Sequence, residues 1–138
     1  MPKALGKALP APLRFEIGEH SAQSDVMRAI LLVTIDADGE PRIATLAASK
    51  ITWCDERRLL VQVLAGSSAE RNLASGRTAL LWNVLDAAAY SIRATPAAAS
   101  QQPRDSNCRA YEFSVIEVAR DFEPGAPMIA GPTYRRLA

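Results

Sequence analysis

The sequence has little of the material from which several kinds of functional site are built. Its 138 residues include two cysteines, Cys54 and Cys108, and one histidine, His20. A zinc site needs several such ligands at close spacing, and this chain offers almost none. We interpret His20, which lies in a polar stretch, as an exposed surface residue, and both cysteines as free thiols.

An excess of charge and a long apolar run are also missing. Lys and Arg total 16 against 15 acidic residues, a net charge of +1. No overall field therefore attracts nucleic acid or an anionic membrane. The longest clean apolar run, Ala29 to Val33, is too short to span a bilayer, and the start MPKALGKALPAPLRF lacks the apolar core of a signal peptide. We expect a cytoplasmic protein with no nucleic-acid or membrane partner.

Common nucleotide and hydrolase motifs are absent as well. The stretch GSSAE lacks the last glycine of a nucleophile elbow, and the chain contains neither GxGxxG nor GxxxxGK[ST]. Serine hydrolase, Rossmann and P-loop assignments are therefore excluded. The length suits one domain with a core of its own.

What the chain does contain divides into three parts. Residues 1–20 are rich in proline and form an expected arm, with a short strand over residues 14–17. Residues 21–122 form the expected domain. It opens with a predicted short helix that begins at Ser21 or Ser24 and places Val26, Met27 and Ile30 on one side. Residues 123–138, rich in proline and glycine, form a tail expected to lie on a surface, of this chain or of a partner.

The domain is dominated by strand patterns. Residues 30–35 and 41–48 predict a hairpin around the turn ADGE, and residues 51–53 and 59–64 predict a second around CDERR. In the second hairpin, Leu59, Val61 and Val63 alternate onto one face.

Two further strands, over residues 79–85 and 89–95, are expected around Asp86, followed by a long last strand. In that last strand, RAYEFSVIEVARDF, the apolar residues change from odd positions to even ones after Val115, which predicts a β-bulge. Six or seven strands with one helix inserted midway favour a barrel over an open α/β sheet.

The helix is predicted in LAGSSAERNLASGR, over residues 68–75, with Gly76 as its stop. Ser67 and Glu70 have the spacing of a capping box, in which each side chain accepts a hydrogen bond from a free backbone N–H. The same free N–H groups and the positive end of the helix dipole also suit an anion. Both interpretations stay open on the residues alone.

The order of these parts resembles a known family. The strand entered by DADGEPRIATLA, the helix start SSAERNLASGR, the strand ALLWNVLD and the closing VIEVARDF resemble the FMN-binding split barrels related to pyridoxamine 5'-phosphate oxidase, over about Asp25 to Phe122. This resemblance implies a mainly β fold: a six- to seven-stranded split β-barrel with one or two short helices. It also implies a homodimer with FMN at the interface.

The resemblance also assigns candidate cofactor-binding residues. Residues on the PRIAT strand would line the flavin and its phosphate, and residues at the helix start would meet phosphate oxygens. The candidates are Arg42, Ala44, Thr45, Ser67, Ser68, Arg71 and Asn72. The family often has a lysine or arginine where this chain has Ala69, so Arg71 or Arg42 would replace that cation. Without the resemblance, we would interpret Arg42 and Arg71 as solvated surface cations and Thr45 as an ordinary strand residue.

The implied function is an oxidoreductase that transfers hydride through bound FMN, with an unidentified small-molecule substrate. The cofactor carries the redox chemistry, so no catalytic side chain is assigned. Oxidation of pyridoxamine phosphate itself is not expected, because no stretch resembles the RxHDR substrate grip. One alternative is a non-catalytic flavin- or haem-binding or interaction protein of the same fold. A lipocalin-like barrel is disfavoured by the inserted helix. Trp53 and Trp82 are interpreted as packing residues rather than flavin contacts.

Overall fold

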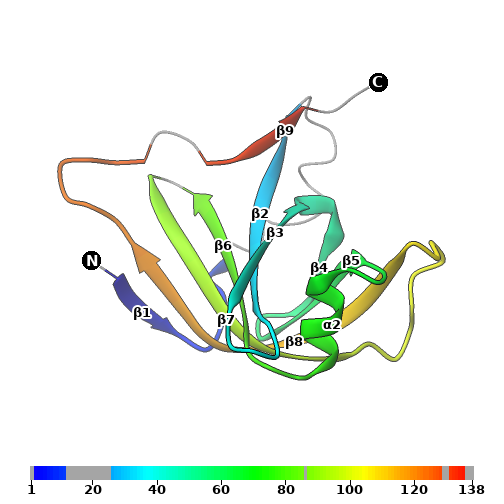
Figure 1. Cartoon of the computed structure of the whole chain (residues 1–138). Coiled ribbons are helices and arrows are strands. Elements are labelled where there is room, and N and C mark those ends of the chain that lie inside the picture. Colours follow the sequence, from blue (N-terminus) through cyan, green and yellow to red (C-terminus); the bar gives the residue numbers. More distant parts are fainter. Residues whose placement is uncertain (1, 12–25, 86, 129–130, 136–138) are drawn as a thin grey trace.

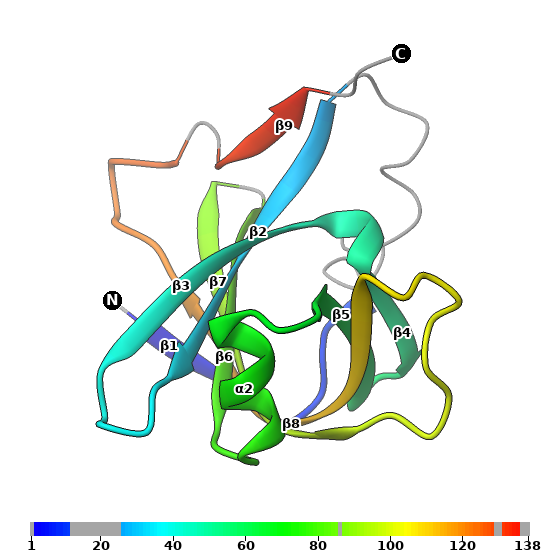
Figure 2. The same ribbon diagram turned by 45° about the vertical axis from the view of Figure 1, so that its right-hand side comes forward.

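The fold is a strongly curled antiparallel sheet with one short helix on its concave side (Figures 1 and 2). The computed structural model describes residues 2–11, 26–85, 87–128 and 131–135. The strands are β1 (Pro2–Gly6), β2 (Val26–Ile35), β3 (Pro41–Ala47), β4 (Ile51–Asp55), β5 (Arg58–Leu64), β6 (Ala79–Leu85), β7 (Ala88–Ala98), β8 (Cys108–Asp121) and β9 (Thr133–Arg135). The helices are the 3-10 turn η2 (Ala48–Lys50) and α2 (Ser68–Ala74).

The sheet runs in the order β3-β2-β6-β7-β8-β5-β4, with β1 added to β8 and β9 added to β2. All of these pairs are antiparallel. The two end strands, β3 and β4, follow each other in the chain through η2 but do not pair, so the curled sheet stays open between them. The expected mainly β split barrel of six or seven main strands is confirmed.

Both predicted hairpins at the start of the domain are present. The β2–β3 ladder runs from Ala29 opposite Ala47 to Ile35 opposite Pro41, and Gly39 takes a positive φ of 88° in its turn. Glycine adopts this conformation without the steric cost that a side chain would bring. The β4–β5 hairpin surrounds the predicted charged turn. The turn chemistry in the sequence thus fixed both strand connections.

The core follows the alternation that the sequence predicted. Leu59, Val61 and Val63 on β5 are 0%, 0% and 2% exposed. On β8, residue 115 pairs with Ala94 and residue 117 pairs with Arg93, so Ile116 is the extra residue of a bulge. The bulge lets apolar side chains on both sides of it face the core, as expected from the shift between odd and even positions.

Helix α2 packs against the sheet at its open side. It contacts β2, β3, β5 and β7 and buries Leu73, which is 1% exposed (Figure 2). Gly76, two residues after its last residue, takes a positive φ of 79°, as expected of a helix stop. Among the described residues, no helix is long and apolar enough to cross a membrane.

The helix predicted to reach residue 30 is wrong over its described part, because β2 already begins at Val26. The spacing of Val26, Met27 and Ile30 suits a helix in isolation, but two ladders hold the segment extended. Residues 26–28 pair with β9, and the Ala29 N–H donates to the Pro132 carbonyl at 3.0 Å. Tertiary pairing therefore overrides the local pattern. The proposed N-caps Ser21 and Ser24, the strand predicted over 14–17, and His20 lie outside the described residues.

The two ends of the chain contribute strands that the sequence analysis did not predict. Within the expected arm, β1 pairs with β8, and Leu9 is 3% exposed and donates its N–H to the Glu56 carbonyl at 2.9 Å. Within the expected tail, β9 lies on β2, and the Met128 N–H donates to the Ala87 carbonyl at 3.0 Å. The described part of the tail therefore lies against this chain's own sheet.

We expect Gly131→Ala to loosen the tail. A Cβ at this position would lie 2.8 Å from Val84 Cβ and 3.0 Å from its Cγ2, closer than packed carbon atoms come. Overpacking of this kind costs about 1–3 kcal/mol, which urea unfolding would measure. In a double-mutant cycle with Val84→Gly, which removes both of these carbon atoms, the two changes should cost less together than their sum. Additive costs would contradict this packing.

Candidate functional site

Strand β3 and the start of α2 line a hollow of about 360 Å³ at the open side of the sheet. Its wall is mainly apolar toward β3 and β5, where Ala44 and Leu64 lie, and polar toward Ser67 and Ser68. The sequence-predicted residues Arg42, Ala44, Thr45, Ser67 and Ser68 all line it. Because β3 ends the sheet path, one side of its backbone carries no partner among the described strands and is available for hydrogen bonding.

A second hollow, of about 440 Å³, adjoins the first and is lined mostly by charged and polar residues. Arg42 and Ser68 line both hollows. The other lining residues come from the β2–β3 turn and from α2 and its end: Asp36, Ala37, Asp38, Arg71, Asn72, Ser75 and Arg77. The seven residues predicted from separate stretches of sequence are thus brought to one continuous region. We call the first the apolar hollow and the second the polar hollow.

Ser67 has the capping role that the sequence predicted. Its Oγ accepts a hydrogen bond from the Glu70 N–H at 3.1 Å and donates to the Leu64 carbonyl at 2.6 Å. The return bond of the capping box is shifted by one residue, because Glu70 Oε1 accepts from the Gly66 N–H at 2.9 Å rather than from Ser67. Both ends of the Ser67 hydroxyl are therefore used within the protein.

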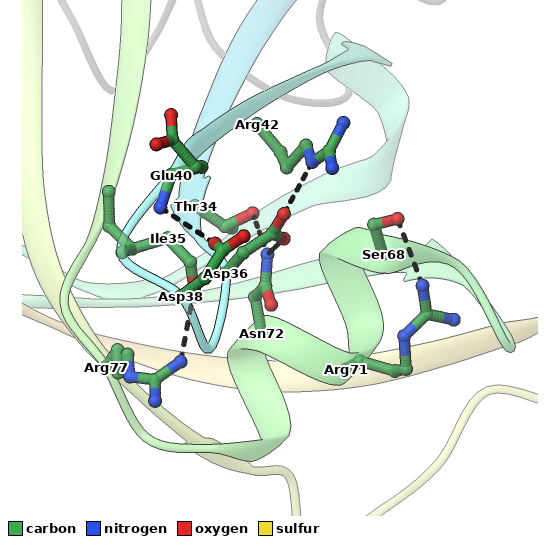
Figure 3. A network of polar contacts seen from close by, with 10 residues as sticks. All are labelled: Thr34, Ile35, Asp36, Asp38, Glu40, Arg42, Ser68, Arg71, Asn72 and Arg77. Atoms are coloured by element: carbon green, nitrogen blue, oxygen red, sulfur yellow. Dashed lines mark hydrogen bonds and ion pairs between the residues drawn. The ribbon is translucent and has the colours of Figure 1, made fainter.

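Ser68 differs from its neighbour. Its Oγ accepts from the Arg71 guanidinium at 3.1 Å (Figure 3). A second nitrogen of Arg71 donates to the Gly66 carbonyl at 2.9 Å. Arg71 thus lies folded over the start of its own helix, with its charge next to the Ser68 hydroxyl. Ala69, where the resembling family often has a cation, is 7% exposed and borders the apolar hollow. The charged residue that lines this hollow is Arg42, and Arg71 lines the adjoining hollow.

A polar network joins α2 to the β2–β3 hairpin. Asn72 is 7% exposed, and its amide nitrogen donates to Thr34 Oγ1 at 3.1 Å and to Asp36 Oδ1 at 2.8 Å. The other carboxylate oxygen of Asp36 accepts from Arg42 Nε at 2.6 Å (Figure 3). Across the turn, Arg77 approaches the Ile35 carbonyl at 3.5 Å. This network positions the polar groups around the polar hollow.

The network shifts the titration of its charged members. The hydrogen bond from Asn72, followed by that from Arg42, lowers the pKa of Asp36 below its ordinary value. The hydrogen bond to Asp36 and the negative charge of that carboxylate raise the pKa of Arg42. Because the folded-state pKa of Asp36 is depressed, its contribution to stability is complete above the unfolded-state pKa. That contribution is lost as the pH falls through the folded value.

The sequence analysis missed Asp36, Thr34 and Arg77. Asp36 stands between the apolar run of residues 30–35 and the predicted turn ADGE, and the sequence analysis gave it no role. Its pairing with Asn72 spans 36 residues, and no local pattern indicates it. Among the described residues, no group of His, Cys, Asp and Glu could hold a metal ion.

Comparison with solved structures identifies the fold of this chain. No family model matches the sequence, and no curated protein matches it. Solved structures do match. A candidate pyridoxamine 5'-phosphate oxidase from Lactobacillus delbrueckii has a TM-score of 0.64 at 18% identity, over 84% of this chain and 98% of that one. The chain has the split-barrel fold of the pyridoxamine 5'-phosphate oxidase-like proteins.

Other split barrels among the matches carry different names. A protein from Clostridium acetobutylicum, related to general stress protein 26 and of the pyridoxinephosphate oxidase family, has a TM-score of 0.55 at 12% identity, over 83% of this chain and 87% of that one. An F420 reductase has a TM-score of 0.50 at 11% identity, over 73% and 94%. At these identities the likeness establishes the split-barrel fold, and the function must be argued from the site.

We expect Asn72→Ala to raise the pKa of Asp36 toward its ordinary value, because the Asn72 hydrogen bond is the larger of the two that lower it. Arg42→Ala should raise the same pKa, because Arg42 lowers it both by its hydrogen bond and by its charge. Carbon-13 NMR titration of the Asp36 carboxyl would measure both changes. An unchanged pKa in either variant would contradict this network.

Proposed function

We propose that this protein binds FMN across the two hollows and acts as an FMN-dependent oxidoreductase. The observation that carries the proposal is that the apolar hollow and the polar hollow are adjacent. Arg42 and Ser68 line both of them. FMN has the matching division into a planar ring system and a phosphate. Both volumes fall in the range of small-molecule sites, about 300–1,000 Å³.

The residues present fit the phosphate. The guanidinium groups of Arg42 and Arg71 and the hydroxyl of Ser68 are the kinds of donor that hold phosphate oxygens, and charge-assisted bonds of this type are the stronger ones. Asn72 already donates to Thr34 and Asp36, so its proposed part is to position this donor set. Ser67 is proposed to shape the same turn as a cap.

The ring would lie in the apolar hollow against Ala44 and Thr45 on β3 and Leu64 on β5. Hydrogen-bonding atoms on the edge of a ring fit the free backbone side of β3, which ends the sheet path. When bound, FMN would supply the hydride chemistry. The chain's own part is to bind and orient the cofactor.

A second copy of the chain is proposed to complete the site. Ile43 and Leu64 are 69% and 63% exposed, and both border the apolar hollow. Large apolar side chains exposed together around a hollow are typical of an interaction surface. A homodimer with FMN at its interface would cover them and close the hollow from solvent.

FMN and riboflavin differ by the phosphate alone, so their affinities test the polar side. Flavin-fluorescence titration should show tighter binding of FMN by the wild type. Ser68→Ala and Arg71→Ala should each weaken FMN by about tenfold, the size of a lost charge-assisted hydrogen bond, and leave riboflavin unchanged. Arg93→Ala, which removes an arginine paired with Glu117 elsewhere on the sheet, is the control.

Ser67→Ala separates capping from binding. It should cost about 1 kcal/mol of stability and change the preference for FMN over riboflavin by less than the Ser68 variant does. Equal wild-type affinity for the two flavins, or binding of neither, would contradict the proposed function.

Light scattering would test the dimer. The wild type should have twice the 14.9 kDa mass of one chain. Ile43→Asp should shift the protein to monomer and weaken flavin binding, because a charge on this surface must be desolvated in the interface. Met128→Asp, at another exposed apolar residue, should leave both unchanged. A wild-type monomer at micromolar concentration would contradict the shared site.

A further inference from the structure

Arg42, one of the proposed phosphate-binding groups, is already engaged. Its Nε donates to Asp36 Oδ2 at 2.6 Å (Figure 3). The Arg42 side chain is 61% exposed and that of Asp36 is 19% exposed. The guanidinium lies at the end of a long flexible side chain that borders both hollows. An anion entering the polar hollow therefore meets an arginine that holds a carboxylate.

Asp36 is the fixed member of this pair. Its second carboxylate oxygen is held by Asn72, an amide that is 7% exposed. Its backbone is held in the β2–β3 turn, where its N–H donates to the Glu40 carbonyl at 2.8 Å and its carbonyl accepts from the Gly39 N–H at 2.9 Å. None of these bonds involves Arg42, so they hold the carboxylate at the wall of the polar hollow independently of that side chain.

We infer that Asp36 competes with a bound phosphate for Arg42 and so sets the specificity of the site. This inference rests on the proposed function. A phosphate must draw Arg42 away from Asp36 and tolerate the negative charge left behind. A phosphate attached to a ring gains the contacts of the apolar hollow in return, whereas a free phosphate gains none. Asp36 therefore makes occupation of the polar hollow depend on occupation of the apolar one.

The charges around the polar hollow support this assignment. Arg42, Arg71 and Arg77 face Asp36 and Asp38 there. Arg71 also contacts Ser68 and the Gly66 carbonyl, which are neutral groups, so it can turn toward a phosphate without uncovering a negative charge. Arg42 is the arginine whose movement exposes a carboxylate. Binding sites often gain specificity by lowering their affinity for the wrong ligand as well as by raising it for the right one.

The test is Asp36→Asn, which removes the charge and keeps an oxygen to accept from Asn72. Affinities for FMN, riboflavin and inorganic phosphate would be measured by flavin fluorescence and by the NMR shift of the Arg42 Nε resonance. FMN and inorganic phosphate should each bind about fivefold more tightly, the size expected of one partly exposed charge pair, and riboflavin should be unchanged. Asp55→Asn is the control, because Asp55 pairs with Arg58 at 2.9 Å on another part of the surface.

A second comparison keeps the test independent of any loss of folding. In an Arg42→Ala background, Asp36→Asn should change FMN affinity less than it does when Arg42 is present, because the competition runs through that side chain. An equal gain in both backgrounds would overturn the competition. Thermal unfolding of each variant would report its stability separately from its affinity.

The remaining outcomes separate this inference from the proposed function. If wild type binds FMN but Asp36→Asn leaves FMN affinity unchanged or lower, the inference is overturned and the FMN proposal stands. An equal change for riboflavin also overturns it, since Asp36 would then act through the fold. If no variant binds a flavin while inorganic phosphate binds more tightly to Asp36→Asn, the FMN proposal fails and the competition at Arg42 stands.

Discussion

The buried amide of Asn72 is the interaction on which the arrangement of the site depends. It is the point where α2, a helix of 7 residues, is tied by side-chain hydrogen bonds to the β2–β3 hairpin. A helix this short has little stability of its own, so its position is set by packing and by such ties. Through Thr34 and Asp36, the amide fixes the end of β2, and through Asp36 it fixes the resting place of Arg42. Loss of this tie would alter both hollows at once, since Arg42 lines each of them.

The curl of the sheet is the second constraint, because it creates the open side that α2 fills. The bulge at Ile116 falls in β8, which pairs with β1, β5 and β7 and so lies at the centre of the sheet's connections. A bulge increases the local twist while it restores the inward alternation of apolar residues. Curling brings α2, which follows β5 in the chain, into contact with β3, although β3 and β5 are far apart along the sheet path. The candidate site is therefore a consequence of how the strands bend, as well as of which residues they carry.

Sequence alone predicts those parts of this structure that depend on local chemistry. The hairpins around ADGE and CDERR, the Ser67 cap, the stop at Gly76 and the bulge each have a short-range signal, and each is present. The start of β2 and the strands β1 and β9 are held by pairing with distant segments, and local patterns do not report such pairing. For the same reason, the family resemblance predicted site residues on β3 and α2 but did not point to Asp36, whose partners come from a helix and from the neighbouring strand.

The adjacent serines of the helix start show why one motif supported both capping and anion binding. The Ser67 hydroxyl is fully committed within the protein, accepting from Glu70 and donating to Leu64, so it belongs to the cap. The Ser68 hydroxyl lines both hollows and holds the guanidinium of Arg71. A cap fixes the first turn of a helix, and the residue after it is thereby held at a set position on the helix surface. Capping and binding are thus not rival interpretations of this stretch: the rigidity that Ser67 gives the turn is what would let Ser68 and Arg71 meet a ligand in a defined geometry.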